Sequence, residues 1–257
     1  MSDVVRSTIE RRSACLNLSH RDLTVLPATD LSQISDLKIL LLNDNKLIMP
    51  PSEILHFTGL LELNLSGNQI TLLPSGIERL RQLTFLDLSH NRLGYLSSEL
   101  CQLINLKELW IVKSELVGLP ENLGILSRLE ILALQKNSLA SLPDSLGEME
   151  SLKWLNIAEN NLIDLPGNMT GMRRLTYLNV SGNSLGKLPD CLLTVRSLEA
   201  IHARNCNLSQ LPDLGTLVQS LTSLFLLNCR ENPFQEKSDL SEWIDQNRFL
   251  FQYTEEM

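Results

Sequence analysis

Aromatic residues and long apolar runs are scarce in this chain of 257 residues. Aromatic side chains make up only 5% of the sequence although 43% of it is hydrophobic, so a core must be built mainly from aliphatic side chains. No apolar run approaches the roughly 18 residues that a membrane-spanning helix needs. The first residues include the acidic Asp3, and they lack the apolar segment of a secretory signal and the Met-Gly start of a myristoylation site. We therefore expect no insertion into a membrane.

Basic charge is also in short supply. The chain has 22 Lys and Arg residues against 30 Asp and Glu residues, which gives a net charge of −8 at pH 7. Nucleic acids and anionic lipid surfaces are themselves negatively charged, so they repel a protein with this balance. We therefore expect no nucleic-acid partner.

Cysteines are few, odd in number and scattered along the chain. Secreted disulfide-rich domains instead carry an even number of cysteines in a compact framework. We interpret the five thiols as small buried hydrophobic side chains in a cytoplasmic protein. They are Cys15, Cys101, Cys191, Cys206 and Cys229.

Residue patterns that carry catalysis or bind metal are missing or misplaced. The four histidines are His20, His56, His90 and His202. They show no metal-ligand spacing, and no phosphate-binding G-x-x-x-x-G-K-[ST] loop occurs. Residues 182–186 match the G-x-S-x-G pattern of hydrolase nucleophiles around Ser184, but they occupy a turn that recurs at residues 66–69 without the pattern. We expect no enzymatic activity, no metal and no cofactor.

What the sequence does contain is one frame of about 23 residues, repeated throughout. Its clearest copy, residues 175–189, reads L-x-x-L-x-V-x-x-N-x-L-x-x-L-P. The ninth residue of the frame, here called the ladder residue, is Asn45, Asn68, Asn91, Asn137, Asn160, Asn183 or Asn232 in seven copies and Arg21, Ser114 or Cys206 in three more. Consecutive ladder residues are 24, then seven times 23, and finally 26 residues apart. Ten copies in frame predict a solenoid of ten repeats.

Within one copy, each residue type has a mechanical role. Leu63 and Leu65 alternate with polar neighbours, which is the period of two typical of a strand with one buried face. The ladder asparagine follows where the chain must turn, and its amide can satisfy backbone groups that the turn would bury unpaired. After it, Ile77, Leu80 and Leu83 recur every three residues, as in a short helix or 3₁₀ turn. One copy cannot bury its own leucines, so stacked copies must form the core.

The frame matches the leucine-rich repeat signature. Segments such as residues 119–126 and 142–149 resemble intracellular leucine-rich repeat proteins of the Ras-suppressor and Ras-scaffold type, and the likeness covers about residues 13–234. It implies an α/β fold, a right-handed horseshoe with a parallel β-sheet on the concave face and short helices or 3₁₀ turns on the convex face. It also implies that other proteins bind on the concave side or the rims. Extracellular relatives usually carry clustered cysteines in both flanks, and this sequence does not.

Both ends differ from the repeats. Residues 1–12 form a candidate N-terminal cap, in which the spacing of Val5 and Ile9 predicts a short amphipathic helix. Residues 235–257 form a C-terminal segment, for which the pattern after Asp239 predicts a capping helix over residues 239–250. The repeat domain between them spans residues 13–234 and is a single domain.

Two repeats are irregular. Ser114 can make fewer hydrogen bonds than asparagine. Two interpretations stay open: the sequence has drifted from the frame and the ladder is locally weaker, or the surface around Trp110 is locally adjusted. The ninth repeat is three residues longer than its neighbours, which predicts a longer helix on its convex side.

The concave face is the candidate binding site. Residues six, four and two positions before each ladder residue point outward, and in repeats four to eight they include unusually large side chains. The predicted partner-binding residues are Phe85, Asp87, Glu108, Trp110, Ile131, Trp154, Tyr177, His202 and Arg204. Two interpretations compete: these side chains shield the sheet and one another, or the contiguous apolar group marks a partner site. The contiguity favours a partner site.

The predicted function is therefore that of a non-enzymatic protein–protein interaction scaffold or adaptor in cytoplasmic signal transduction, monomeric on its own. Two alternatives stay open at this point. One is a regulatory or substrate-recognition subunit of an enzyme complex, such as a phosphatase or ubiquitin ligase. The other is a structural component of a cytoskeletal or ciliary assembly.

Overall fold

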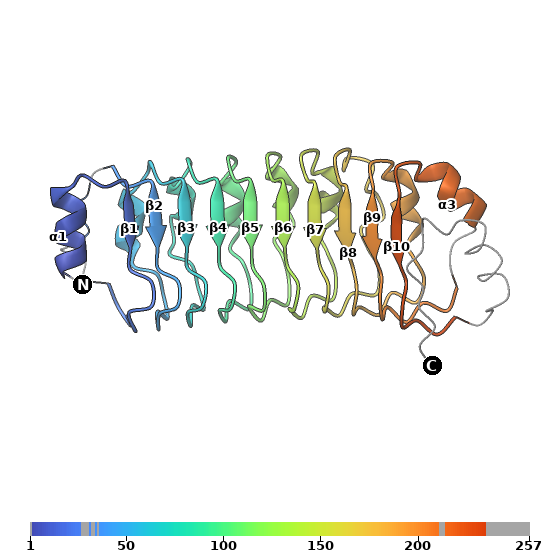
Figure 1. The fold of residues 1–257 in the computed structure, drawn as a ribbon, viewed down its shortest axis with the longest axis horizontal. Coiled ribbons are helices and arrows are strands. Elements are labelled where there is room, and N and C mark those ends of the chain that lie inside the picture. Colours follow the sequence, from blue (N-terminus) through green and yellow to red (C-terminus); the bar gives the residue numbers. More distant parts are fainter. Residues whose placement is uncertain (1, 27–30, 32–33, 35, 211–213, 235–257) are drawn as a thin grey trace.

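The computed structural model describes residues 2–26, 31, 34, 36–210 and 214–234. Ten parallel strands form one sheet in which every strand pairs with the next in sequence, from β1 to β10 (Figure 1). The strands are β1 (Cys15–Asn17), β2 (Ile39–Leu41), β3 (Glu62–Asn64), β4 (Phe85–Asp87), β5 (Glu108–Trp110), β6 (Ile131–Ala133), β7 (Trp154–Asn156), β8 (Tyr177–Asn179), β9 (Ala200–His202) and β10 (Leu226–Asn228). The ten-repeat solenoid predicted from the sequence is confirmed.

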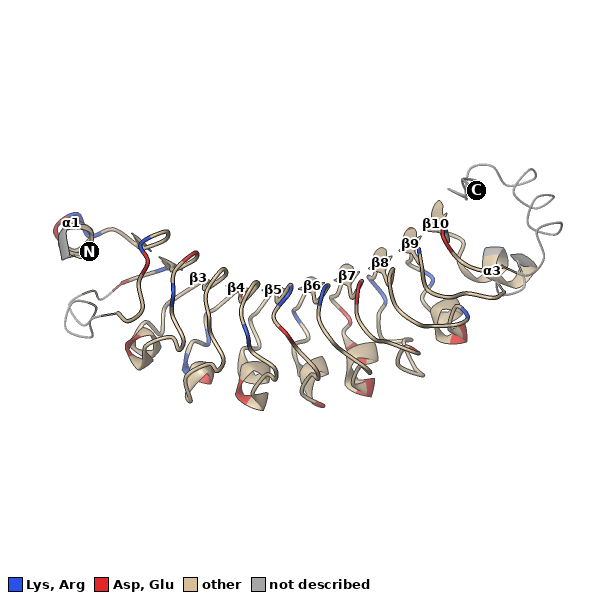
Figure 2. Ribbon diagram, turned by 90° about the horizontal axis from the view of Figure 1, so that it is seen from below, with Lys and Arg blue, Asp and Glu red and all other residues tan. Residues whose placement is uncertain are grey.

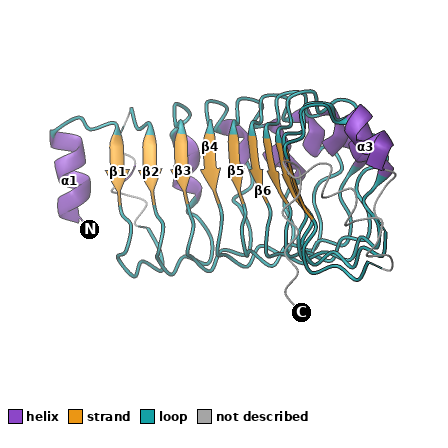
Figure 3. Cartoon of the chain, turned by 45° about the vertical axis from the view of Figure 1, so that its right-hand side comes forward, coloured by secondary structure: helices purple, strands orange, loops and turns teal. Residues whose placement is uncertain are grey.

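Short helices form the other side of the stack. They are the 3₁₀ helices η1 (Ser52–His56), η2 (Ile77–Arg79), η3 (Ser98–Gln102), η4 (Leu123–Ile125), η5 (Asp144–Glu148) and η6 (Asp190–Thr194). Figure 2 shows the strands along the inner side of a shallow arc and the helices along its outer side, and Figure 3 shows the helices behind the sheet. The predicted division into a concave sheet and a convex helical side is therefore correct.

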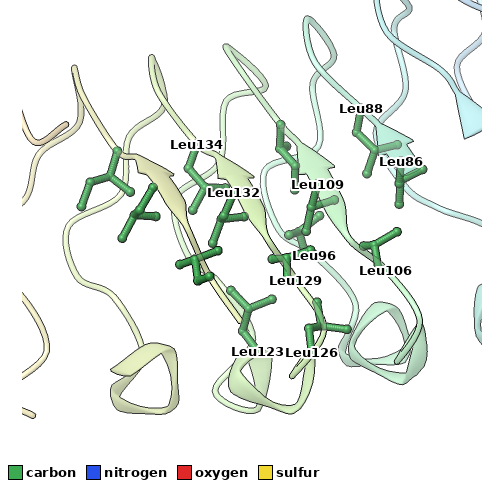
Figure 4. Close-up of a cluster of buried hydrophobic side chains, with 14 of the residues drawn as sticks. Leu86, Leu88, Leu96, Leu106, Leu109, Leu123, Leu126, Leu129, Leu132 and Leu134 are labelled. Atoms are coloured by element: carbon green, nitrogen blue, oxygen red, sulfur yellow. The ribbon is translucent and has the colours of Figure 1, made fainter. Parts of the chain in front are cut away.

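The core lies between these two layers and consists mainly of leucine, with isoleucine, valine and methionine at other positions. The central residue of every strand is buried, and Leu132, Leu155 and Leu178 have no exposed surface. Equivalent leucines of successive repeats stack along the solenoid axis, so each repeat covers the apolar face of the next (Figure 4). This stacking explains why so few aromatic residues are needed.

The asparagine ladder closes the turns after the strands. The side-chain amide of Asn160 donates to the carbonyl oxygens of Ile157 in its own repeat and of Leu134 in the preceding repeat, each at 3.0 Å. Its carbonyl accepts from the backbone N–H of Leu139 at 3.0 Å. One side chain thus satisfies buried backbone groups of two repeats, as expected from its chemistry.

Ser114 replaces this asparagine only in part. Its hydroxyl donates to the Leu88 carbonyl at 3.0 Å, but the shorter side chain does not accept the neighbouring backbone N–H as an asparagine carbonyl does. In a regular repeat that N–H, for example of Ile70, donates to the ladder side chain, here Asn91, at 2.9 Å. At the irregular repeat the N–H of Leu93 donates instead to the backbone carbonyl of Ser114 at 2.9 Å. The main chain therefore supplies the acceptor that the side chain lacks.

Successive convex limbs approach so closely that some positions leave no room for a side chain. A Cβ atom added to Gly124 would lie 2.0 Å from the carbonyl oxygen of Ser145. At Gly147 it would lie 1.9 Å from the carbonyl oxygen of Asn168. Backbone packs directly on backbone at these two places, which fixes the distance between repeats five to seven on the convex side.

The described part of the two ends follows the sequence pattern. Helix α1 (Ser2–Glu10) precedes β1, with Val5 buried and Ile9 partly buried against the core. Helix α3 (Leu214–Ser220) lies in the long ninth repeat, which confirms the longer convex helix predicted there. The capping helix predicted over residues 239–250 lies outside the described residues.

Candidate functional site

The predicted partner-binding residues all lie on strands β4 to β9 or directly after β9. In these strands the central residue is buried and its two neighbours face out of the concave side, because side chains alternate along a strand. Eight of the nine are half-buried, namely Phe85, Asp87, Glu108, Trp110, Ile131, Trp154, Tyr177 and His202. Arg204 is exposed. The alternation therefore placed these side chains on the correct face.

Four of these side chains form one continuous aromatic run. The ring centroids of Trp110 and Trp154 are 5.7 Å apart, those of Trp154 and Tyr177 are 5.4 Å apart, and those of Tyr177 and His202 are 5.3 Å apart. The Trp154 and Tyr177 rings are stacked, with 7° between their planes, whereas the other two pairs are tilted. The run crosses the sheet from β5 to β9.

A small residue, Ala133, allows the first contact of this run, between Trp110 and Trp154. Ala133 on β6 lies beside Trp110 in the strand register, and its outward methyl group leaves space above the sheet. The indole of Trp110 reaches across this strand to Trp154 on β7. Ala133 faces outward yet has no exposed surface, so neighbouring side chains cover it. The rings therefore do shield part of the sheet, as one of the two interpretations held, while their outer surfaces stay half-exposed.

The two ends of the run differ in their electrostatic surroundings. On the β5 side, the indole N–H of Trp110 donates to a carboxylate oxygen of Glu108 at 3.2 Å. On the β9 side, Arg204 pairs with Glu231, which raises the pKa of the guanidinium and lowers the pKa of the carboxyl group. Burial lowers the pKa of His202 below its usual value, so this ring is neutral at neutral pH.

Two apolar residues of the predicted site remain outside the aromatic run. Phe85 on β4 and Ile131 on β6 make none of the ring contacts found among the described residues. Phe85 lies instead between Glu62 on β3 and Glu108 on β5 in the strand register. Ile131 pairs in register with Trp154 and packs at the side of the run.

Comparison with known proteins starts from the repeats themselves. A family model described as Leucine rich repeat matches residues 49–93 and 127–185. These segments fall inside the ten-stranded stack. The chain is a leucine-rich repeat solenoid. None of the curated proteins compared with this solenoid matches it.

Several solved structures are similar to the solenoid. A TDR receptor is similar to the solenoid with a TM-score of 0.75 and 30% identity over 90% of this chain and 41% of the receptor chain. The structure of PEPR1-AtPEP1 gives a TM-score of 0.64 and 28% identity over 85% of this chain and 35% of that chain. The plant peptide hormone receptor RGFR1 in complex with RGF2 gives a TM-score of 0.70 and 23% identity over 89% of this chain and 41% of that chain. The solenoid therefore spans less than half the length of each of these chains.

A second apolar surface was missed by the sequence reasoning. In the first five repeats of the solenoid, the third or fourth residue after the ladder residue is a large, exposed hydrophobic side chain. This rim stripe consists of Val25, Ile48, Met49, Leu72, Tyr95 and Val117. Of these, Val25 is 74% exposed and Tyr95 is 70% exposed, so they contribute little to the core. Aligning the ten repeats by their ladder residues would have revealed the stripe.

The cysteine interpretation needs one correction. Cys101, Cys206 and Cys229 are buried as expected, and the thiol of Cys206 takes part in the ladder by donating to the Val180 carbonyl at 3.2 Å. Cys15 and Cys191 are only half-buried. The reason is that Cys15 occupies an outward position of β1, which strand alternation turns away from the core.

The remaining sequence candidates take ordinary places in the solenoid. Ser184, in the G-x-S-x-G match, follows the ladder residue Asn183, and its backbone N–H donates to the Leu162 carbonyl at 2.8 Å as part of the repeat. The described part of the chain contains no group of three or more His, Cys, Asp or Glu side chains that could hold a metal ion. Across the same residues, no helix has the length and apolar character needed to cross a membrane.

Proposed function

We propose that this solenoid is a non-enzymatic protein-interaction module that binds a protein or peptide partner on its concave face, and that it acts as a scaffold or adaptor in cytoplasmic signalling. The observation that supports the proposal best is the aromatic run of Trp110, Trp154, Tyr177 and His202. Large rings that are held rigid by their neighbours and stay half-exposed offer contact area at little entropic cost, and tryptophan and tyrosine are frequent binding anchors.

The fold supports the same proposal. Stacked repeats create an extended concave surface, and such surfaces commonly mediate protein–protein interaction. The TDR receptor, at 30% identity, is named as a receptor, a class of proteins that bind other molecules.

The experiment is an affinity capture of partners from a cytoplasmic extract, carried out with the wild-type chain and two single variants. Trp154→Ala removes the centre of the aromatic run, and Tyr95→Ala, the matched control, removes an exposed ring from the rim stripe. We expect the specifically captured proteins to be lost with Trp154→Ala and kept with Tyr95→Ala. The partners' identities would also separate a signalling adaptor from a subunit of an enzyme complex or of a cytoskeletal assembly.

The opposite result would contradict the proposed site. Capture that is lost with Tyr95→Ala and kept with Trp154→Ala would place the main site on the rim stripe. A thermal melt of each variant shows whether lost capture reflects lost binding or lost structure. Because Trp154 is proposed as a binding anchor, its replacement by alanine is expected to weaken binding of the partner by about 2–4 kcal/mol.

A further inference from the structure

The outward positions within the strands of the concave sheet carry charges of one sign only. At the two outward positions of each of the ten strands, the only side chains that carry a full charge at neutral pH are Glu62, Asp87 and Glu108. All three lie on β3 to β5, next to the start of the aromatic run at Trp110. Arg204, two residues after β9, is paired with Glu231.

Strand register places these carboxylates around two aromatic rings. Phe85 lies between Glu62 and Glu108 in adjacent strands, which are ~4.8 Å apart on either side. Asp87 lies directly beside Trp110. The carboxylates therefore lie beside two half-exposed rings.

Ion pairs do not neutralise these three carboxylates in the described part of the chain. Within the described residues, none of the three carboxylates has a Lys or Arg side chain close enough for an ion pair. Glu108 accepts one hydrogen bond from Trp110, and Asp87 accepts one from the backbone N–H of Ser89. The negative charge of this part of the sheet is thus available to a binding partner.

We propose that the concave face binds an extended basic segment of a partner protein, with an arginine or lysine side chain lying over Phe85 and Trp110 between the carboxylates of Glu62, Asp87 and Glu108. This inference rests on the proposed function and names the chemistry of its partner. A cation over an aromatic face gains from the ring quadrupole, and each ionised carboxylate nearby adds a charge-assisted hydrogen bond. Apolar or aromatic side chains of the same segment lie on Trp154 and Tyr177.

Distances set the length and placement of the segment. From β3 to β8 the sheet advances five strand spacings, or ~24 Å, which an extended peptide crosses with about seven residues. Its basic end lies over β3 to β5, because the carboxylates of Glu62, Asp87 and Glu108 lie there, whereas the charge of Arg204 is already paired with Glu231. The other end reaches the stacked pair of Trp154 and Tyr177.

The test selects displayed random peptides, long enough to cross the sheet, on the immobilised full chain and then measures the enriched peptides by fluorescence anisotropy. Three variants are compared with the wild type. The first carries Glu62→Gln, Asp87→Asn and Glu108→Gln. The second, with the same change in net charge, carries Glu121→Gln, Glu148→Gln and Glu150→Gln, which are exposed carboxylates away from the concave strands. The third is Trp154→Ala.

We expect the enriched peptides to contain Lys or Arg beside aromatic or aliphatic residues. Their affinity should fall about tenfold or more in the first variant, should stay unchanged in the second, and should fall as NaCl rises from about 0.05 to about 0.5 M. Peptides without basic residues, or equal affinity for the first variant, would overturn this inference while leaving the proposed function intact if Trp154→Ala still abolishes binding.

The remaining outcomes are also decisive. Enriched peptides that bind Trp154→Ala as well as the wild type would overturn the proposed function, because their site would lie elsewhere. Selection that enriches no peptide at all would show that this face does not take a linear segment. A thermal melt of all three variants confirms that each is folded.

Discussion

The ring of Trp154 lies flat against the ring of Tyr177, with 5.4 Å between their centroids and 7° between their planes. The same indole contacts Trp110 on its other side, at 5.7 Å. Trp154 is therefore both the centre of the candidate binding surface and a structural link between β5, β7 and β8. Strand alternation alone suggests an outward side chain with little influence on folding, and these contacts change that expectation.

Replacing Trp154 by alanine should lower the free energy of unfolding by about 1–3 kcal/mol, because two aromatic contacts of about 0.5–1.5 kcal/mol each are removed. Urea denaturation followed by circular dichroism measures the loss. Trp154→Phe serves as control, since a smaller ring retains part of both contacts and should cost less. An unfolding free energy unchanged in Trp154→Ala would show that the ring contacts contribute no stability.

Leu155, one residue further along β7, points the opposite way into the core and has no exposed surface. Leu155→Ala should cost about 2–5 kcal/mol through lost burial and the cavity left behind. The matched control is Leu72→Ala in the rim stripe, where the side chain is 63% exposed and the change should stay within about 0.5 kcal/mol. Equal losses at the two positions would contradict the core described here.

Asn160→Ala should destabilise the chain by about 1–3 kcal/mol, because it leaves the buried backbone N–H of Leu139 without its acceptor. It also removes one of the two asparagine donors that the carbonyl oxygens of Leu134 and Ile157 each receive. Ser114→Ala should cost less, since the backbone carbonyl of Ser114 already receives one of the N–H groups that an asparagine would serve. Urea denaturation of both variants shows which of them loses more of the free energy of unfolding. A greater loss at Ser114 would mean that the ladder is not held by the asparagine side chains.

Gly147→Ala should prevent normal stacking of the convex limbs, because the added methyl carbon would lie 1.9 Å from the Asn168 carbonyl oxygen. The backbone must move, so we expect a lowered melting temperature and a broader transition. Gly167→Ala is the control, as an added Cβ there meets nothing within 4 Å. A melting temperature that falls equally in both variants would attribute the effect to loss of glycine itself rather than to the close approach.

His202 should make stability depend on pH below neutrality. Burial lowers its pKa in the folded state below the 6.5 of an ordinary histidine, so the unfolded chain binds the proton more readily. The contribution of this residue is therefore fully present above pH 6.5 and is lost as the pH falls through the folded pKa. NMR titration of the ring should give a pKa below 6.5, and His202→Phe should flatten this part of the stability profile. A ring pKa at or above 6.5 would contradict the burial of this side chain.

The concave and convex layers could be predicted because the residue spacing within each repeat specifies its local conformation. Leucines at a spacing of two followed by asparagine, and then apolar residues at a spacing of three, allow one repeat geometry, and ten copies multiply the signal. The same alternation placed Trp110, Trp154 and Tyr177 on the correct face. The extra residues of the ninth repeat likewise predicted the helix α3.

Contacts between repeats could not be predicted in this way. Trp110 and Trp154 belong to repeats that are not adjacent, and their contact depends on the small side chain of Ala133 on the intervening strand. The same holds for the backbone carbonyl of Ser114, which accepts the N–H that the missing asparagine would have served. Each depends on how far neighbouring backbones approach, which no single repeat specifies.

The sequence by itself determined the fold of this protein, the number of its strands, the leucines of its core and the face on which each large side chain lies. Those features follow from local periods of two and three residues, which the covalent geometry of the chain enforces. Only the tertiary structure decided that Trp110, Trp154, Tyr177 and His202 form one run, and that Gly147 has no room for a methyl group. Both results depend on the spacing and register between repeats, which arise when ten units pack together and not within any one of them.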